Sequence, residues 1–211
     1  MNNIVITVNR ECGSGGREIA YKLGEKLGLK VYDRDLLENV SKQFDITKED
    51  MDRVKAQKPN WWSDFCRFYQ QFGAVASIDT INPKPTPLSL FNAERKLLLE
   101  VAEKEPCIVV GRAGFHIFRD HPNAFHLLIL ADKDARVKRI SEKQHLSEEE
   151  SSKIIDRIDE ERETFTHTVA NTSRYDARHY DIVLNVTGLT TDSVANFLAD
   201  NIKKKYPFLA E

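Results

Sequence analysis

The sequence has few cysteines and no long apolar run. Its three cysteines, Cys12, Cys66 and Cys107, are widely spaced and form no CxxC pair. An odd, scattered set of cysteines is not a disulfide framework, so we expect a reducing compartment. No stretch of about 18 apolar residues occurs, so the sequence predicts no membrane-spanning helix and no membrane partner.

The chain also lacks a strong excess of charge of either sign. Lys and Arg number 31 and Asp and Glu number 33, which gives a formal net charge of -2 at pH 7. Proteins that coat nucleic acids carry a large basic excess, so no nucleic-acid partner is expected, and any phosphate should be held locally. Residues 1–4 show neither the basic nor the apolar segment of a secretion signal. We therefore expect a cytoplasmic protein.

What is present suits a globular domain. Hydrophobic residues make up 41% of the 211-residue chain, enough for a sizeable core, and the length favours a single domain over residues 1–211. Five short apolar segments predict buried strands at residues 4–8, 30–32, 107–110, 125–130 and 181–186. Helices are predicted between them, at residues 17–27, 35–44, 90–105, 132–143, 147–168 and 191–204. This alternation indicates an α/β fold, a three-layer α/β/α sandwich with a five-stranded parallel sheet.

Two helix ends carry local signals. Gly28 follows the first predicted helix and can end it in the left-handed conformation that glycine adopts easily. Ser147 and Glu150 have the spacing of a capping box, which predicts that a helix starts at Ser147.

The segment from about residue 47 to residue 90 differs from the rest. Its aromatic residues recur at helical spacing and are Trp61, Trp62, Phe65, Phe68, Tyr69 and Phe72. Three prolines, Pro83, Pro85 and Pro87, stiffen its exit. We interpret the segment as a helical insertion whose apolar face packs on the main domain or on a second subunit, so a homo-oligomer is one expected partner. A platform for stacking a base is the alternative.

A glycine-rich turn, Gly13-Ser14-Gly15-Gly16, separates the first predicted strand from the first helix. Backbone N–H groups in such a turn converge on an anion, and the helix start adds partial positive charge. Arg17 in the first helical turn can supply a fixed charge. The alternative to a phosphate site is an ordinary strand–helix turn.

Two nucleotide-binding patterns compete for this turn. The dinucleotide fingerprint G-x-G-x-x-G lacks its third glycine here, although Asp33 and Asp35 lie about 20 residues on, where a ribose-binding acid is expected. In the P-loop pattern G-x-x-x-x-G-K-[ST], aligning Gly15 with the last glycine puts Gly16 at the Lys position and Arg17 at the Ser or Thr position. Neither pattern is complete.

A succession of segments resembles the cytidylate kinase-like family of P-loop nucleoside monophosphate kinases. The resemblance rests on residues 13–20, on Tyr32-Asp33-Arg34-Asp35-Leu36-Leu37, on Val110-Gly111-Arg112, on Leu130-Ala131-Asp132 with Arg136 and Arg139, and on residues 180–185. It covers nearly the whole chain apart from the aromatic insertion. It implies a P-loop kinase fold and transfer of the ATP γ-phosphoryl group to a pyrimidine nucleoside monophosphate, with CMP or dCMP favoured and ATP and Mg²⁺ as cofactors.

The resemblance also implies roles for single residues. The turn formed by Gly13, Ser14, Gly15 and Gly16, with Arg17 and Glu18, would cradle the ATP phosphates, and Arg17 would also be a catalytic residue. Asp33 would serve the substrate or magnesium, Arg112 would grip the substrate phosphate, and Asp132 would lie near the cytosine or the sugar. The family has an Asp after its Gly-Arg pair, where this chain has Ala113.

A lid over both nucleotides is expected at about residues 145–178. Arg157 and Arg162, on either side of Asp159, resemble its catalytic arginines, and Arg174 or Arg178 could serve instead. Several arginines suit phosphoryl transfer, which needs alignment and positive charge more than covalent help.

The missing P-loop residues leave alternatives open. Arg10 or Arg17 could replace the lysine charge. Ser14, Glu18 or Asp33 could hold magnesium. No metal site made of protein side chains alone is expected, because the histidines His116, His121 and His126 recur every five residues, a spacing that suits neither a helix nor a strand. Two further functions stay possible. One is a non-catalytic protein that binds a nucleotide or phosphometabolite with a degenerate P-loop, and the other is a kinase for a non-nucleotide acceptor.

Overall fold

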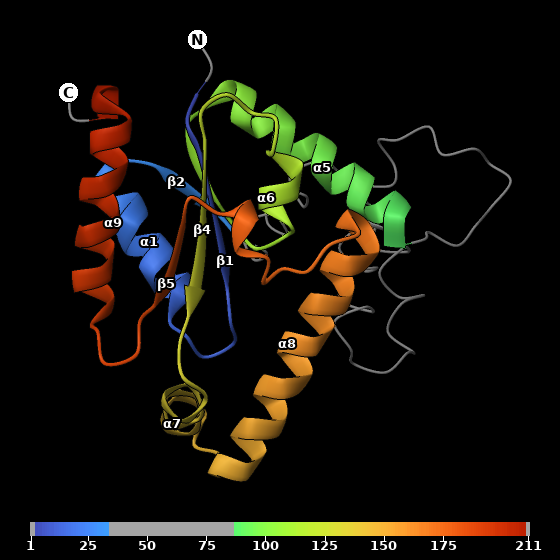
Figure 1. Cartoon of the computed structure of the whole chain (residues 1–211), viewed down its shortest axis with the longest axis vertical. Coiled ribbons are helices and arrows are strands. Elements are labelled where there is room, and N and C mark those ends of the chain that lie inside the picture. The colour runs from blue at the N-terminus through green and yellow to red at the C-terminus, as the bar shows by residue number, and fades with distance from the viewer. Residues whose placement is uncertain (1–2, 34–86, 210–211) are drawn as a thin grey trace, which may run out of the picture. The chain divides into compact units, whose positions relative to one another are not determined.

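The computed structural model describes residues 3–33 and 87–209 (Figure 1). By their contacts the residues divide into two compact units, one of Met1–Tyr32 with Ala102–Glu211 and one of Asp33–Val101. The predicted helix at residues 35–44 and the aromatic residues of the predicted insertion lie outside the described residues. Helix α5 (Pro87–Lys104) lies in the second unit up to Val101, and it confirms the helix predicted at residues 90–105.

The first unit is built on a parallel sheet of five strands. They are β1 (Val5–Arg10), β2 (Lys30–Tyr32), β3 (Cys107–Val110), β4 (Ala124–Leu130) and β5 (Ile182–Asn185). Their order in the sheet is β2-β3-β1-β4-β5, so the first strand lies in the centre. Short, nearly continuous apolar strands are typical of a parallel sheet covered on both faces. The predicted α/β class and five-stranded parallel sheet are confirmed.

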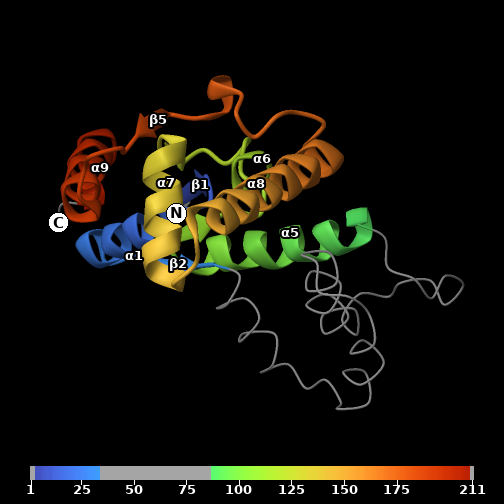
Figure 2. The ribbon, with the colours of Figure 1, turned by 90° about the horizontal axis from the view of Figure 1, so that it is seen from below.

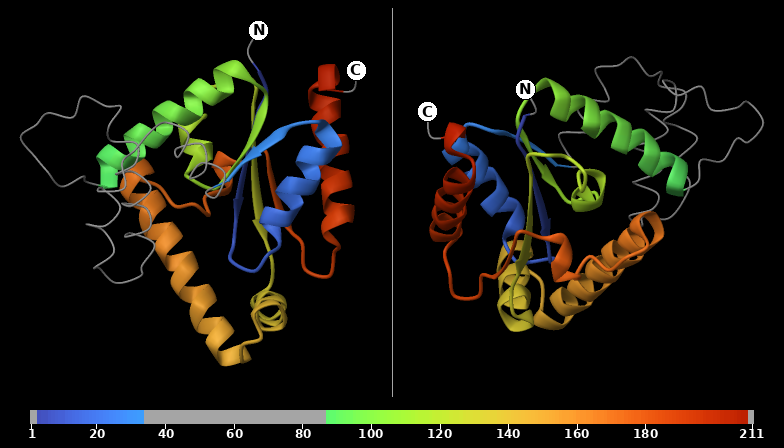
Figure 3. Two further views of the ribbon diagram at one scale, coloured as in Figure 1. Left: turned by 180° about the vertical axis from the view of Figure 1, so that it is seen from behind. Right: turned by 45° about the horizontal axis from the view of Figure 1, so that its top comes forward.

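Helices cover this sheet and its carboxyl edge. Those of the first unit are α1 (Gly16–Leu27), α6 (Gly114–Ile117), α7 (Lys133–Gln144), α8 (Glu148–Ala170) and α9 (Thr191–Lys205), with the 3₁₀ turns η1 (Ala177–His179) and η2 (Pro207–Leu209). Helices α1 and α9 lie side by side along one face of the sheet, as Figures 1 and 3 show. Helices α7 and α8 pack together at the carboxyl ends of the strands (Figure 2).

Residues of β1 alternate between two buried faces. Ile6 and Val8 belong to the large core that includes Leu23 of α1 and Leu198 of α9. Thr7 faces the opposite side, where a Cβ added to Gly114 of α6 would lie 3.2 Å from its Cβ. The central strand is therefore covered on both faces, and its exposure increases only at the carboxyl end, at Asn9 and Arg10.

The predicted helix ends agree with the structure. Gly28 ends α1 with a φ of 66° and donates its N–H to the carbonyl of Gly24. Ser147 caps α8, where its hydroxyl accepts from the N–H of Glu150 and the Glu150 carboxylate accepts from the N–H of Ser147. The 3₁₀ turn η1 and the single-turn helix α6 were not predicted.

The other local features concern cysteines and membranes. Cys12 and Cys107 are buried free thiols, and Cys66 lies outside the described residues. In residues 3–33 and 87–209, no helix is both long and apolar enough to cross a membrane.

Candidate phosphate-binding site

The glycine-rich turn lies between the carboxyl end of β1 and the start of α1. Gly15 occupies the N-cap position of α1 with a φ of 83°. The buried hydroxyl of Ser14 donates to the carbonyl of Glu11 (3.0 Å) and accepts from the N–H of Gly16 (3.3 Å). Within the described part of the chain, no oxygen accepts from the N–H of Gly13 or Gly15. The turn thus offers amide donors next to a helix start, where an anion is stabilised.

Two arginines of α7 hold the carbonyl groups of this turn. Arg136 Nη1 donates to the carbonyl of Cys12 (3.3 Å), and Arg139 Nη1 donates to the carbonyl of Gly13 (2.7 Å). They stand three residues apart, so both project from one face of the helix. These two hydrogen bonds fix the backbone of the turn and place two guanidinium groups directly beside it.

Two more arginines reach the carbonyl of Arg10, at the end of β1. Arg162 Nη1 of α8 donates to it at 3.3 Å, and Arg174 Nη2, from the segment after α8, donates to the same oxygen. Arg174 is fully buried, and its Nε finds no hydrogen-bond partner among the described residues. A buried, partly unsatisfied guanidinium is costly, which points to a role beyond holding the fold.

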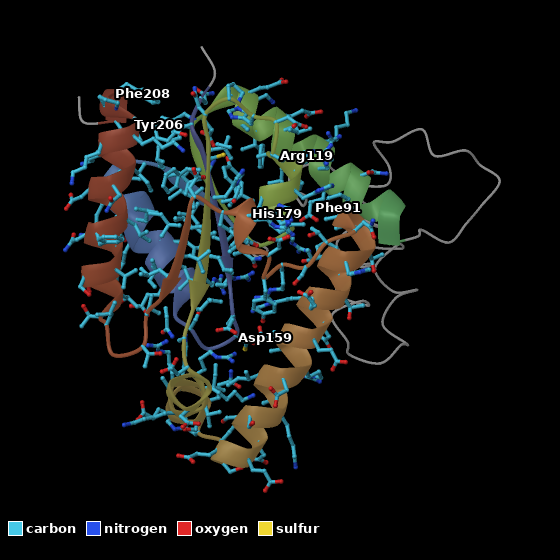
Figure 4. All side chains as sticks on the ribbon, in the orientation of Figure 1. Phe91, Arg119, Asp159, His179, Tyr206 and Phe208 are labelled. Atoms are coloured by element: carbon cyan, nitrogen blue, oxygen red, sulfur yellow. The ribbon has the colours of Figure 1, made fainter. Side chains whose placement is uncertain are left out.

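Asp159 of α8 joins these arginines to the turn. Its Oδ1 accepts from the N–H of Cys12 (2.9 Å), and its Oδ2 accepts from Arg136 Nη1 (2.7 Å). Arg162 and Arg174 each lie 3.5 Å from Oδ1. In Figure 4, Asp159 lies on the side of α8 that faces the sheet. One carboxylate therefore connects α7, α8 and the chain after α8 to the turn.

Glu11 makes a second acidic connection. Its Oε2 accepts from the N–H of Ala131 (3.0 Å), just after β4, and its Oε1 lies 3.6 Å from Arg136 Nη2. Glu11 thereby fixes the turn to the neighbouring strand. The two carboxylates, Glu11 and Asp159, both act as structural links and only partly offset the arginines.

Positive charge dominates the site. The guanidinium groups around the turn belong to Arg10, Arg112, Arg136, Arg139, Arg162 and Arg174. Desolvation lowers the pKa of Arg10 well below its usual value, and Arg162, Arg174 and Arg112 lower it further by repulsion. Burial and the charge of Arg174 also lower the pKa of Arg162. Like charges gathered in this way favour a bound polyanion.

The predicted turn residues have different surroundings. Arg17 is exposed on α1, with its guanidinium carbon 5.8 Å from the centre of the Tyr21 ring. Glu18 is also exposed, accepts from Thr191 Oγ1 (2.6 Å) and lies 3.3 Å from Lys22 Nζ. Its pKa is lowered, first by the Thr191 hydrogen bond. Arg157 is exposed on α8, whereas Arg162 on the same helix reaches the turn.

The predicted substrate residues lie at strand ends. Arg112 follows β3 and has a φ of 58°. Asp132 follows β4, where its Oδ1 accepts from Asn185 Nδ2 (2.8 Å) and its N–H donates to Thr187 Oγ1 (2.7 Å). Asp33 is buried and begins the second unit.

Sequence reasoning missed the linking carboxylates, Glu11 and Asp159. The available signal was the i, i+3 spacing of Asp159 and Arg162 on a helix predicted to reach the site. Cys12, beside the turn, packs with Val137, Ile140 and Ile155. Burial raises its pKa, so it is a packing residue rather than a reactive thiol.

Carboxylates and hydroxyls near the turn are the side chains that could bind a magnesium ion. No group of three or more His, Cys, Asp or Glu side chains in the described ranges could hold a metal ion by itself. Ser14 uses its hydroxyl inside the turn. A magnesium ion that arrives with a polyphosphate would draw part of its coordination from phosphate oxygens.

Solved structures share this fold. A crystal structure of a protein from Eubacterium ventriosum is 26% identical, with a TM-score of 0.68 and coverage of 96% of this chain and 99% of that one. TT1252 from Thermus thermophilus is 16% identical, with a TM-score of 0.57 and coverage of 98% and 99%. Shikimate kinase from Bacteroides thetaiotaomicron is 13% identical, with a TM-score of 0.52 and coverage of 95% and 98%. The last two show the fold alone.

The sequence comparisons decide the family. Among curated proteins no relative matches the sequence. The family profile, in contrast, matches residues 5–188, which include all five strands, the glycine-rich turn and the arginines around it. The chain therefore belongs to the cytidylate kinase-like family.

Proposed function

We propose that this protein transfers the γ-phosphoryl group of ATP to a pyrimidine nucleoside monophosphate, with CMP or dCMP as the favoured acceptor. The observation that carries the proposal is the gathering of Arg10, Arg112, Arg162 and Arg174 at the end of β1. Membership of a kinase-like family supports the coarser statement that the chain is a phosphotransferase that uses ATP. The choice of acceptor is the finer part and rests on the likeness to cytidylate kinases.

The arrangement suits phosphoryl transfer for electrostatic reasons. The transition state spreads negative charge over the moving group, and catalysis comes from alignment and from fixed positive charge. ATP supplies the phosphoryl group. The amides of Gly13 and Gly15 would hold its phosphates, and Arg162 and Arg174 would neutralise charge as it develops. Because Asp159 already orients both arginines, little reorganisation is needed when the anion binds.

The remaining predicted residues take roles within this proposal. Arg112 would grip the acceptor phosphate, and Asp132 would lie near its base or sugar. Glu18 and Asp33 are the proposed magnesium ligands, directly or through water. Arg17 at the start of α1 would act on the triphosphate.

Closure would complete the site. The proposed lid at about residues 145–178 would carry Arg157 toward the nucleotides and exclude water from the transfer. Helix α8 forms most of that segment, and Arg162 and Asp159 already connect it to the end of β1 and to the turn.

A second function is favoured by a specific observation. Gly16 and Arg17 stand where P-loop kinases have Lys and a hydroxyl residue that serves magnesium. A protein with these replacements could bind a nucleotide or phosphometabolite without turnover. Ala113, which replaces the family's Asp after Gly111-Arg112, similarly favours a kinase for a non-nucleotide acceptor.

A coupled assay of ADP release separates these functions. Purified protein, MgATP and each of CMP, dCMP, UMP, AMP and GMP are mixed in turn, with an acceptor-free reaction as the blank. Acceptor-dependent ADP release that is fastest with CMP or dCMP supports the proposal. Release with none of them, combined with tight ATP binding, contradicts it and favours binding without turnover or a different acceptor. Arg162→Met should lower turnover, with Arg119→Met, an exposed surface arginine, as the matched control.

A further inference from the structure

The degenerate P-loop contains an exchange of residues. With Gly15 aligned on the last glycine of G-x-x-x-x-G-K-[ST], Arg10 stands at the first glycine and Gly16 stands at the lysine. A cation and a glycine have therefore traded places within one motif. The side-chain geometry shows that the two positions depend on each other.

Gly16 is a glycine because of Arg10. It is the first residue of α1 and has an ordinary helical conformation, so backbone strain does not require glycine there. A Cβ at Gly16 would lie 2.5 Å from Arg10 Cβ and 3.1 Å from Arg10 Cγ. The stem of Arg10 fills the space from which a lysine at position 16 would extend.

A second glycine makes room for the other end of Arg10. Gly111 follows β3 with a φ of 79°, which by itself favours glycine, and a Cβ added to it would also overlap Nη1 at the movable end of Arg10. Arg10 therefore crosses from the end of β1, over Gly16, to the end of β3. Glycines on two separate elements accommodate this single side chain.

The guanidinium of Arg10 lies among other cations. Within residues 3–32 and 102–209, no carboxylate or carbonyl oxygen pairs with it, and its charged neighbours include Arg162, Arg174 and Arg112. The residue is partly exposed. A partly desolvated cation held beside other cations costs stability unless an anion joins it.

We propose that Arg10 takes the place of the P-loop lysine and binds the terminal phosphates of the nucleoside triphosphate. Gly16 and Gly111 leave the space that its side chain occupies. The inference rests on the proposed function, because it deepens the description of the same ATP site. It assigns the substituting charge to Arg10 and not to Arg17.

The first experiment restores the P-loop pattern, with glycine at position 10 and lysine at position 16. Binding of MgATP and of magnesium tripolyphosphate is measured by calorimetry for Arg10→Gly, Gly16→Lys and the double variant. Arg10→Gly should bind both probes about tenfold to hundredfold more weakly, because charge-assisted hydrogen bonds are lost. Gly16→Lys should lower Tm, because its stem collides with Arg10. The double variant restores both the room and the cation, so it should regain binding and melt above Gly16→Lys.

A second experiment separates a binding role from a structural one. Arg10→Met keeps the apolar stem and removes the charge. The ligand-free variant should melt at or above the wild-type temperature, because repulsion is relieved, while its affinity for MgATP falls. Arg10→Lys should recover part of the affinity. Arg119→Met is the matched control and should change neither quantity.

Three results would overturn the inference. The first is wild-type MgATP affinity in Arg10→Met. The second is a loss of affinity in Arg17→Met in place of Arg10→Met. The third is a double variant that binds and melts no better than the sum of the single changes predicts. If wild-type protein binds no ATP at all, the proposed function falls together with the inference, so the two failures are told apart by the wild-type titration.

Discussion

The two ends of β1 differ in what surrounds them. Val5, Ile6 and Val8 are almost completely buried in apolar surroundings. At the carboxyl end, Asn9 and Arg10 are partly exposed, and the carbonyl of Arg10 receives two guanidinium groups. Apolar burial stabilises the first end, whereas the second end gathers like charges that oppose stability. One short strand thus connects the apolar core to the cluster of arginines that we propose as an anion site.

The charged end is held by a few connections, and this sets the order of expected effects. Breaking the link through Asp159 should cost the most, because it leaves the fully buried Arg174 without its carboxylate partner. Removing one core side chain should cost somewhat less and should leave the charged end intact. Changes at a helix end or in a single protonation equilibrium should have the smallest effects.

Asp159→Ala tests the charged end and should have the largest effect. It removes the acceptor of the Cys12 N–H and the partner of Arg136 and Arg174. The free energy of unfolding should fall by about 3–5 kcal/mol, measured by urea denaturation. Asp156→Ala, on the exposed side of α8, is the control and should change stability little. Equal effects of the two variants would show that the Asp159 link does not hold the site.

Leu23→Ala tests the apolar end. Leu23 is fully buried in the core shared with Ile6 and Leu198. Truncation should lower the free energy of unfolding by about 3 kcal/mol, from lost burial and the cavity left behind. Phe197→Ala, at 49% exposure on α9, should cost far less. The folded Leu23→Ala protein should bind MgATP as the wild type does. A large loss of affinity would show that nucleotide binding depends on the packing of the apolar core.

Ser147→Ala tests how α8 is anchored. The hydroxyl caps the helix that carries Asp159 and Arg162 to the turn. Losing this cap should lower the free energy of unfolding by about 1 kcal/mol, as read from thermal or urea melts. Ser147→Asp replaces one capping acceptor with another and should retain most of the stability. A loss as large as that of Asp159→Ala would mean that the helix start governs the site.

Acid should weaken the protein slightly through His126 of β4. Its Nδ1 lies 2.8 Å from Thr7 Oγ1, and its pKa is lowered below 6.5, mainly by burial. The unfolded chain then binds the proton more readily, so this contribution is complete above pH 6.5 and is lost as pH falls below it. The free energy of unfolding of His126→Gln should depend less on pH between 7 and 5 than that of the wild type. Identical slopes would contradict this assignment.

Local structure was predictable from the sequence. The strand at residues 107–110 has the predicted bounds, because an apolar run between polar residues defines its ends. Gly28 and the capping box at Ser147 also behave as predicted. Each of these features depends on residues within a few positions of one another, which is the range over which sequence patterns carry information.

Which residues form the candidate site was harder to predict, because the site depends on contacts between residues far apart in the sequence. Arg174 meets the carbonyl of Arg10 across 164 positions, and Asp159 meets Cys12 across 147. Spacing along the chain says nothing about such meetings. Arg157 and Arg162 looked equivalent in the sequence, yet the helix turns one toward solvent and the other toward β1. The role of each position in catalysis stays a prediction.

The three residues after β3 have a practical consequence for protein engineering. Gly111, Arg112 and Ala113 have φ values of 79°, 58° and 49°, and two of them have side chains that disfavour this conformation. Ala113→Gly would therefore be an attractive choice for raising thermal tolerance. A screen that selects only for heat resistance would enrich such changes, and it would relax the backbone next to Arg112.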